Sequence, residues 1–429
     1  MKISSILGLN ARSRLYLTHN SIKARRIADS KLITKRTLKK AGIQIPEIYA
    51  KFKNTEDISN FDWSALPSSF ALKPSRGLGG EGIVVVKKKL SDGNWLTTQR
   101  QKTTVSDLKL HISDILEGAY SLGNSPDVAY IEEFVGRHKA FRKYAFRGTP
   151  DIRVIVFNKV PVMAMLRLPT KESGGRANLF QGAIAVGIDM ATGITTSANW
   201  NGEYIKYKPD TTRKLNGIKI PSWTKILEIS VNCQIASGLQ YIGVDIVLHP
   251  EKGPMVLEIN AQPGLKIQLA NKAGLRKRLE RVEDLEVRDA EHGVKIAKAI
   301  FADRFSDRVA AEEGIKTIGV WEDVKVVGAD KKKHLIKAKI DTGAWKSSID
   351  KDLAKKLGIL SGSNVLWTKV YKSSLGKEVR KVVSLTFYLA GTRIATIANT
   401  ATRSHLRTAL IIGRKDLKGF LVKADKEVK

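Results

Sequence analysis

The sequence predicts an α/β (α+β) domain followed by a small all-β domain. A chain of 429 residues exceeds what one hydrophobic core organises, so more than one domain is expected. Up to about Ile315, strand-like runs alternate with helical patterns; beyond it, short strands separated by turn residues follow one another. We therefore expect a first domain over residues 1–300, a helical linker over 301–316 and a β domain over 317–429.

The elements of the first domain follow from periodicity and from turn signals. Residues 21–43 predict one helix that ends at Gly42. A strand, a short helix and a second strand are expected within 45–73, and a helix over 105–118. The run DVAYIEEFV is strand-like, and DIRVIVFNKVPVMAMLRL predicts a hairpin with Asn158 and Lys159 at its turn.

Two further strands and several helices complete the first domain. An amphipathic helix is expected over 222–240, and it leads into the strands YIGVDIVL and PMVLEIN. Mixed-charge helices follow over 275–312. No internal repeat or long low-complexity segment is evident.

The charge of the chain is unusual. Apolar content of 42% and charged content of 27% are typical of a folded protein, but the net charge is +32. From Ile318 onward 24 Lys and Arg oppose 10 Asp and Glu, while the whole chain holds 74 against 42, so both parts are basic. Nucleic acid, an acidic membrane surface, an acidic peptide and a generally lysine-rich composition each account for this charge.

Several classes of protein are excluded or disfavoured by composition. The single Cys233 excludes a disulfide framework and thiolate zinc sites, and the seven His residues show no zinc-binding spacing. The first apolar run is too short for a signal peptide, and no stretch is long enough to span a membrane. We therefore expect a cytoplasmic protein without a membrane span.

A glycine-rich stretch, ALKPSRGLGGEGIVVV over residues 71–86, is the first candidate site. Glycines at 77, 79, 80 and 82 let backbone N–H groups approach an anion, and Lys73 on the preceding strand would neutralise phosphate charge. The spacing fits neither a P-loop nor a Rossmann fingerprint. An ordinary glycine-rich hairpin is the alternative interpretation.

Oxygen ligands on two neighbouring strands form the second candidate site. Glu258 and Asn260 lie on one face of their strand by alternation, and a tight hairpin sets Asp245 beside them. Two carboxylates and an amide oxygen suit Mg²⁺, with Mn²⁺ as the alternative ion, and the metal also takes phosphate oxygens. A polar strand edge in solvent explains them less well, because each strand is otherwise apolar.

These motifs occur in a recognisable order. Lys31 in DSKLITKRTLKKAGIQIP, the glycine stretch, YIEEFV, DIR, RANLFQGA, GVDIVL and LEINAQPGL follow one another over roughly residues 1–300. The series resembles the ATP-grasp fold, and most closely the RimK-type alpha-L-glutamate ligases. The resemblance implies ATP and Mg²⁺ as cofactors, and an amino acid with a peptide or protein as substrates.

The resemblance also implies site residues, position by position. Lys31 and Lys73 stand where two lysines contact ATP phosphates, and Arg167 where an arginine lies near the transferring phosphate. Asp245, Glu258 and Asn260 match the metal ligands. The other nucleotide-contacting positions correspond to Gly77, Gly79, Gly80, Glu133, Phe134, Asp151, Arg176, Ala177 and Asn178.

Two departures from the family pattern concern the substrate. The family carries a separate amino-terminal domain before its first lysine, whereas thirty residues precede Lys31 here, so we expect a shortened amino-terminal part. The segment GRHKAFRKYAFRGTP, residues 136–150, is longer than in the family and very basic. It is either a solvated loop or a clamp for an acidic substrate or for phosphates.

The β domain contains Asp341 in AKIDTGAWKSSI and, later, the run ALIIGRKDL. Together these resemble retropepsin-like aspartic peptidases, including the domain associated with RimK families. In that fold each chain contributes one aspartate, so the resemblance implies Asp341 as a catalytic residue and a homodimer through the C-terminal domain. The alternative is a module that binds peptide for the ligase.

We therefore expect an ATP-dependent carboxylate–amine ligase that forms an amide or peptide bond through an acylphosphate. One alternative is an aspartic peptidase or peptide-binding protein with a regulatory ATP-grasp domain. Another is a basic protein associated with nucleic acid, which the aromatic content of 7% and the lack of a nucleic-acid motif disfavour.

Overall fold

The computed structural model describes residues 3–77, 79–302, 316–373, 376–403 and 408–423. The chain folds into two compact units, Met1–Asp284 and Leu285–Lys429. Most of the predicted linker over 301–316, and the end of the helical region predicted over 275–312, fall on residues 303–315, outside the described residues. The predicted domain boundaries stay a prediction.

The first unit begins with helices. The predicted helix over 21–43 is wrong as one element, because it is two helices, α2 (Ile22–Ala28) and α3 (Lys31–Lys40). Ser30 separates them: its hydroxyl accepts from the backbone N–H of Ile33 and so caps α3. The N–H of Lys31 donates to the carbonyl of Ser75 at 3.0 Å, which ties the start of α3 to the glycine stretch. The unit also contains α1 (Leu9–Leu15).

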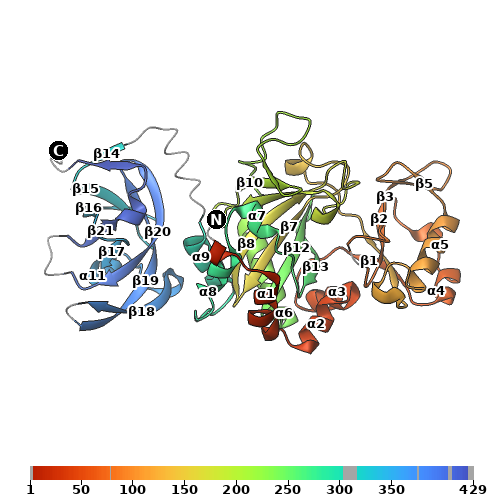
Figure 1. Ribbon diagram of the computed structural model, residues 1–429, viewed down its shortest axis with the longest axis horizontal. Helices are drawn as coiled ribbons and strands as arrows, with labels where there is room; N and C mark the ends of the chain where they lie inside the picture. The colour runs from red at the N-terminus through yellow and green to blue at the C-terminus, as the bar shows by residue number, and fades with distance from the viewer. Residues whose placement is uncertain (1–2, 78, 303–315, 374–375, 404–407, 424–429) are drawn as a thin grey trace. The chain divides into compact units, whose positions relative to one another are not determined.

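A six-stranded sheet with two helices forms one part of the first unit (Figure 1). Its core is a cluster of buried side chains that includes Phe70, Trp95 and Ile112. The strands in spatial order are β1 (Ile48–Phe52), β6 (Ala129–Glu133), β2 (Phe70–Pro74), β3 (Val84–Lys89), β4 (Trp95–Thr97) and β5 (Lys102–Thr103), and the helices are α4 (Thr55–Ser59) and α5 (Val105–Leu116). The glycine stretch connects β2 to β3, which pair antiparallel.

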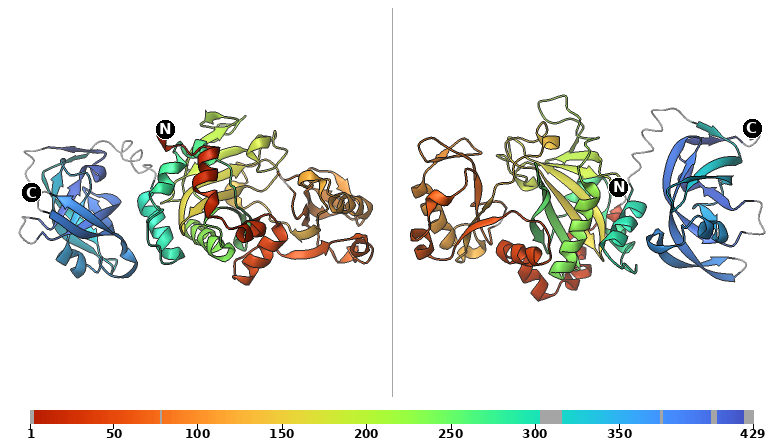
Figure 2. Two further views of the ribbon diagram at one scale, coloured as in Figure 1. Left: turned by 60° about the horizontal axis from the view of Figure 1, so that its bottom comes forward. Right: turned by 180° about the vertical axis from the view of Figure 1, so that it is seen from behind.

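A seven-stranded antiparallel sheet forms the centre of the first unit, with α6 (Trp223–Ser237) lying along it (Figures 1 and 2). The strands in spatial order are β11 (Glu203–Ile205), β10 (Thr195–Trp200), β9 (Ile184–Ile188), β8 (Val160–Leu168), β7 (Asp151–Phe157), β12 (Tyr241–His249) and β13 (Gly253–Asn260). Asn158 and Lys159 form the predicted turn between β7 and β8, both with positive φ. The helices α7 (Ile267–Asn271) and α8 (Leu275–Glu280) follow β13.

The second unit is a β barrel with two described helices. Its seven-stranded sheet closes through the additional pairing of β15 with β19. The strands in order are β15 (Trp321–Val327), β16 (Lys333–Asp341), β21 (Leu410–Gly413), β17 (Ser348–Asp350), β20 (Thr392–Ala401), β19 (Gly376–Leu389) and β18 (Val365–Ser373). The parallel pair β14 (Lys316–Ile318) and β22 (Phe420–Val422) adds a small sheet, and the helices are α9 (Ala290–Ile300) and α11 (Lys351–Lys356).

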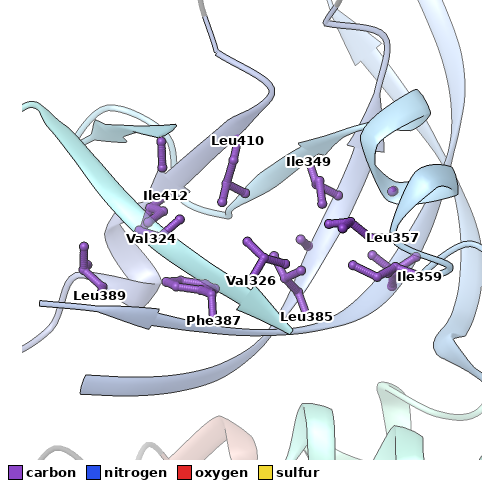
Figure 3. Close-up of a cluster of buried hydrophobic side chains, with 14 of the residues drawn as sticks. Val324, Val326, Ile349, Leu357, Ile359, Leu385, Phe387, Leu389, Leu410 and Ile412 are labelled. Carbon is purple, nitrogen blue, oxygen red and sulfur yellow. The ribbon is translucent and has the colours of Figure 1, made fainter. Parts of the chain in front are cut away.

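The barrel closes around its own hydrophobic core. Val326, Leu385, Phe387 and Ile412 come from three different strands, and their side chains point into a common interior (Figure 3). All four are buried. The predicted fold class is therefore confirmed: a mixed α/β domain with sheets and helices precedes a C-terminal β barrel.

Candidate active site

A pocket of about 600 Å³ lies within the first unit. The glycine stretch, β6, the central sheet and the segment 174–180 all contribute to its lining. Its lining includes these site residues predicted from the sequence of the first domain: Lys31, Lys73, Gly77, Gly79, Gly80, Glu133, Phe134, Asp151, Arg167, Arg176, Ala177, Asn178, Asp245, Glu258 and Asn260. Gly82, the last glycine named in the stretch, does not line the pocket. Asp341 lies in the second unit, at the end of β16.

The glycine stretch is shaped by conformations that other residues rarely adopt. Gly79 and Gly80 have φ values of 63° and 82°. At Gly77 the constraint is space, because a Cβ there would lie 2.3 Å from Cγ of Pro74. Asn178 closes over the stretch by donating its amide to the carbonyl of Gly79 at 2.8 Å. The stretch is thus a hairpin connection that also lines the pocket, and its binding of an anion stays a prediction.

The two predicted phosphate lysines are held by different partners. Lys31 donates from Nζ to the carbonyl of Gly77 at 2.7 Å, and its Nζ lies 3.9 Å from Oε2 of Glu258. Lys73 donates to Oε1 of Glu132, whose side chain is 1% exposed. Both lysines line the pocket, so each supplies positive charge to its interior.

Glu132 joins Lys73 to a third lysine that the sequence analysis missed. Lys35 is buried, and its Nζ lies 2.7 Å from Oε2 of Glu132. Desolvation raises the pKa of Glu132, but the charges of Lys35 and Lys73 outweigh it and hold that pKa below its usual value. Desolvation also lowers the pKa of Lys35. The spacing of Lys31 and Lys35, one helical turn apart in α3, was the available signal.

Charged side chains from four adjacent strands form a row on one face of the central sheet. Arg167 on β8 opposes Asp151 on β7, and Arg153 on β7 opposes Asp245 on β12. Asp245 in turn opposes Glu258 on β13. Cross-strand neighbours share a face of the sheet, so the pairing register alone sets these groups side by side.

Arginines neutralise the two aspartates of this row. Arg153 donates to both oxygens of Asp245, at 2.6 and 2.5 Å. Arg167 binds both oxygens of Asp151, at 2.5 and 2.6 Å, and reaches Oδ2 of Asp245 at 2.7 Å. Burial raises the pKa of Asp245, but Arg153 and Arg167 outweigh it and lower that pKa. For Asp151 the effect of burial exceeds that of the Arg167 charge. Burial and the negative charge of Asp245 together raise the pKa of Asp151.

A β-bulge refines the placement of the predicted metal ligands. The register between β12 and β13 shifts after the Asp245–Glu258 pair, so that Ile246 pairs with Val256. Leu257 is the extra residue, and both Leu257 and Glu258 line the pocket. Asn260, two residues on, donates its amide to Oδ2 of Asp245 at 3.4 Å. The predicted proximity of the three ligands is confirmed, whereas the bulge was not predicted.

The sequence of this unit matches a family model described as sugar-transfer associated ATP-grasp over residues 10–284. The chain belongs to this ATP-grasp family. The predicted resemblance to ATP-grasp proteins is thereby confirmed. No curated protein matches the sequence.

The solved structures that match this ATP-grasp chain share little sequence with it. An L-amino acid ligase from Bacillus licheniformis matches at 12% identity with a TM-score of 0.33, over 58% of this chain and 43% of its own. A D-alanine–D-alanine ligase from Bacillus anthracis matches at 16% identity and a TM-score of 0.32, over 69% and 72%. A Legionella pneumophila protein of unknown function matches at 16% identity and a TM-score of 0.19, over 27% and 97%. The chain thus spans less than half of the first of these.

ATP-grasp proteins use ATP with Mg²⁺, which agrees with the predicted cofactors. Among the described residues no group of three His, Cys, Asp or Glu is placed to hold a metal ion. Asp245, Glu258 and Asn260 supply only two carboxylates and an amide, so the donor set fits an ion that takes its remaining ligands from phosphate and water. The described helices include none long and apolar enough to cross a membrane.

Proposed function

We propose that the first unit is an ATP-dependent carboxylate–amine ligase of the RimK type, which adds an amino acid to a peptide or protein. One observation carries the proposal: a single pocket collects lysines, arginines, a glycine stretch and a set of oxygen ligands from elements far apart in the sequence. Cations and backbone donors suit phosphate, and the oxygen ligands beside them suit the metal that accompanies phosphate.

The proposed nucleotide site uses both sheets of the unit. Lys31, Lys73 and the glycine stretch bind the phosphates, with Arg176 to Asn178 closing over them. Glu133 and Phe134, where β6 ends, border the base. The carboxylate of Glu133 is held by Lys252, and the N–H of Glu47 donates to its Oε2 at 3.3 Å, so this edge of the pocket is pre-organised.

The proposed metal ligands are Asp245, Glu258 and Asn260. Bound Mg²⁺ would neutralise charge on the transferring phosphoryl group. Glu258 is more available than Asp245, since its side chain is 34% exposed and its ion partner Lys31 lies 3.9 Å away. Asp245 is bound by Arg153 and Arg167, so its binding to metal requires an exchange of partners.

Arg167 is the proposed catalytic residue. A carboxylate oxygen of the substrate attacks the γ-phosphorus and ADP leaves, which gives an acylphosphate. The amine then attacks the acyl carbon, phosphate leaves with the shared oxygen, and the amine nitrogen loses a proton. Arg167 stabilises the developing negative charge, and the pre-formed pairs with Asp151 and Asp245 hold its guanidinium in place for that purpose.

Mass spectrometry of products tests this proposal directly. The full chain is incubated with ATP, Mg²⁺, mixed amino acids and peptides, and ADP release is followed in parallel. We expect ADP together with a product whose mass equals that of two substrates less one water. The Arg167→Met variant, which keeps most of the length of the side chain, serves as the control and should form neither. ADP release without any gain in product mass would contradict a ligase.

A second candidate function concerns the barrel. We propose that Asp341 is the aspartate of a retropepsin-like peptidase that completes its site by pairing two chains. The observation that favours it is local: Oδ1 of Asp341 accepts from the N–H groups of Gly343 and Ala344, both at 2.9 Å, so a turn holds the half-buried carboxylate at the end of β16. In such a peptidase, the Asp341 carboxyl groups of two chains would supply the acid and the base that activate water.

A further inference from the structure

Six exposed or half-buried cations lie on two segments near the pocket, and we call them the basic rim. Lys139, Arg142 and Lys143 belong to the segment 136–150, for which the sequence predicts either a solvated loop or a clamp. The other three, on residues 203–214, are Lys206, Arg213 and Lys214. The sequence alone does not predict that the two segments lie close together.

The two segments of the basic rim are packed against each other. Lys208, half-buried in the second segment, donates from Nζ to the carbonyl of Lys143 in the first at 3.3 Å. Burial lowers the pKa of Lys208, and the positive charges of Arg213 and Arg137 lower it further. Positive groups from both segments are therefore close enough to repel one another.

Carboxylates do not relieve this repulsion within the part of the chain that the structure describes. No rim cation forms an ion pair there, and the acids of the second segment, Glu203 and Asp210, form none either. Neighbouring cations are held by neutral groups instead. Arg137 donates to the carbonyl of Ala145 at 3.2 Å, and Arg147 lies 5.0 Å from the ring centroid of Phe146.

The first segment of the rim runs directly into the wall of the pocket. Gly148 and Thr149 line the pocket, and Thr149 donates to the carbonyl of Val135 at 2.7 Å. Gly148 packs so tightly against Gly175 that an added Cβ would lie 1.6 Å from the carbonyl oxygen of Gly175. The rim is thus anchored to the same loop that carries the proposed nucleotide contacts.

We infer that the basic rim binds the carboxylates of an acidic peptide and presents that peptide to the pocket as a substrate of ligation. The catalytic part of this inference rests on the proposed function. A positively charged surface beside a site for a carboxylate favours a substrate with several carboxylates, because one enters the pocket while others stay on the rim. The carboxylates of the peptide would also supply the ion partners that the rim cations lack among the described residues.

Nucleic acid is the rival polyanion, and the exposed rings of the second segment argue against it. Single strands bind through bases stacked on open aromatic faces. Lys272 lies over the ring of Tyr204 at 4.2 Å, and Lys206 lies over that of Tyr207 at 5.4 Å. One face of each ring is therefore already covered by a lysine.

Fluorescence anisotropy with labelled hexaglutamate tests the inference without any need for catalysis. The full chain is titrated in low salt without ATP, with hexaglutamine as the neutral probe. We expect hexaglutamate alone to bind, and binding to weaken as salt rises. The rim variant Arg142→Glu with Lys143→Glu should bind about tenfold more weakly. The matched control, Lys23→Glu with Arg26→Glu on α2, makes the same change in net charge and should stay within about twofold.

Three outcomes would overturn the inference. Equal weakening in the rim and control variants would mean that only net charge matters. Tighter binding of an oligonucleotide with six phosphates, lost in the rim variant, would identify nucleic acid instead. If the chain ligates neutral peptides, and their KM is the same in the rim variant as in wild type, the basic rim has no role in substrate binding. The proposed ligase would stand in that case. Conversely, if hexaglutamate binds in a way that depends on the rim but the chain releases no ADP, the ligase is refuted. The proposed peptide-binding site on the rim would then stand alone.

Discussion

The ammonium of Lys35 lies 2.7 Å from a carboxylate oxygen of Glu132, and each side chain is only 1% exposed. The two groups carry opposite charges, and their attraction holds the pair together at this buried position. The other oxygen of Glu132 binds Lys73 at the pocket. Two cations therefore share one anion, and the cluster carries a net positive charge that favours a bound anion.

The first prediction concerns the stability of this cluster. Lys35→Met leaves Glu132 buried with one partner fewer, and breaking a buried pair in this way costs roughly 3–5 kcal/mol of unfolding free energy. Urea unfolding of the full chain measures the loss. Adding Glu132→Gln removes the buried negative charge, whose one remaining partner is Lys73, and should restore part of the lost stability. A loss below about 1 kcal/mol for Lys35→Met would show that the pair is not structurally required.

The second prediction concerns the role of Lys73 in ATP binding, as distinct from the role of Lys35 in stability. Lys73→Ala removes a cation that faces the pocket, so ATP affinity should fall roughly ten- to a hundredfold, as expected for a lost contact to a charged group. Isothermal titration measures it. Lys87→Ala, an exposed lysine on β3, makes the same change in charge and should bind ATP normally. Unchanged affinity in Lys73→Ala would place the phosphates elsewhere.

The third prediction concerns the metal. Glu258→Gln removes one negative ligand, and we expect a higher Mg²⁺ concentration for half-maximal ATP turnover. Asn260→Asp adds a negative ligand at the neighbouring position and should shift the same midpoint in the other direction. A magnesium titration of initial rates measures both. Identical midpoints in wild type and both variants would show that these residues do not bind the metal.

The fourth prediction concerns pH and the barrel. Burial raises the pKa of Asp416, although the hydroxyl of Ser347 binds its carboxylate. A carboxyl whose pKa is higher in the folded state binds its proton more tightly there. Stability is therefore lost as pH rises from the unfolded pKa through the folded one. Asp416→Asn should remove this loss and make the barrel more stable than wild type at pH 7. A less stable variant at that pH would contradict the burial argument.

The fifth prediction concerns Asp341. If the barrel cleaves peptides, Asp341→Asn should abolish cleavage, because an amide cannot act as the base of a carboxylate pair. Cleavage by the wild type should also rise faster than linearly with chain concentration, since each chain contributes one aspartate. ATP turnover should be unchanged in the variant, because the pocket residues all lie in the first unit. Loss of ATP turnover in a folded variant would show that the two units act together.

The site was largely predictable because its residues occupy strongly patterned positions. The tight connection from β12 to β13 fixes which residues of the two strands face each other, so the proximity of Asp245 and Glu258 followed from chain order and alternation. The turn at Asn158 and Lys159 similarly identified the β7–β8 hairpin. Where a tight turn joins two strands, the residues that face the pocket can be predicted without knowledge of long-range contacts.

What the sequence did not reveal depends on pairings between distant segments. Glu132 on β6 contacts Lys35 on α3, and the helical spacing of Lys31 and Lys35 does not by itself identify this distant partner. The N-cap at Ser30 was overlooked because apolar periodicity continues across it. The basic rim likewise needs the contact between Lys208 and the segment 136–150, whose Lys143 is 65 residues away along the chain.

The fate of one oxygen atom tests the proposed ligase most directly. A substrate identified by mass spectrometry is labelled with ¹⁸O in its carboxylate and incubated with the full chain, ATP, Mg²⁺ and the amine. Transfer through an acylphosphate predicts that each phosphate released carries one labelled oxygen, because the carboxylate oxygen that attacked phosphorus leaves with it. Amide product accompanied by unlabelled phosphate would contradict the mechanism.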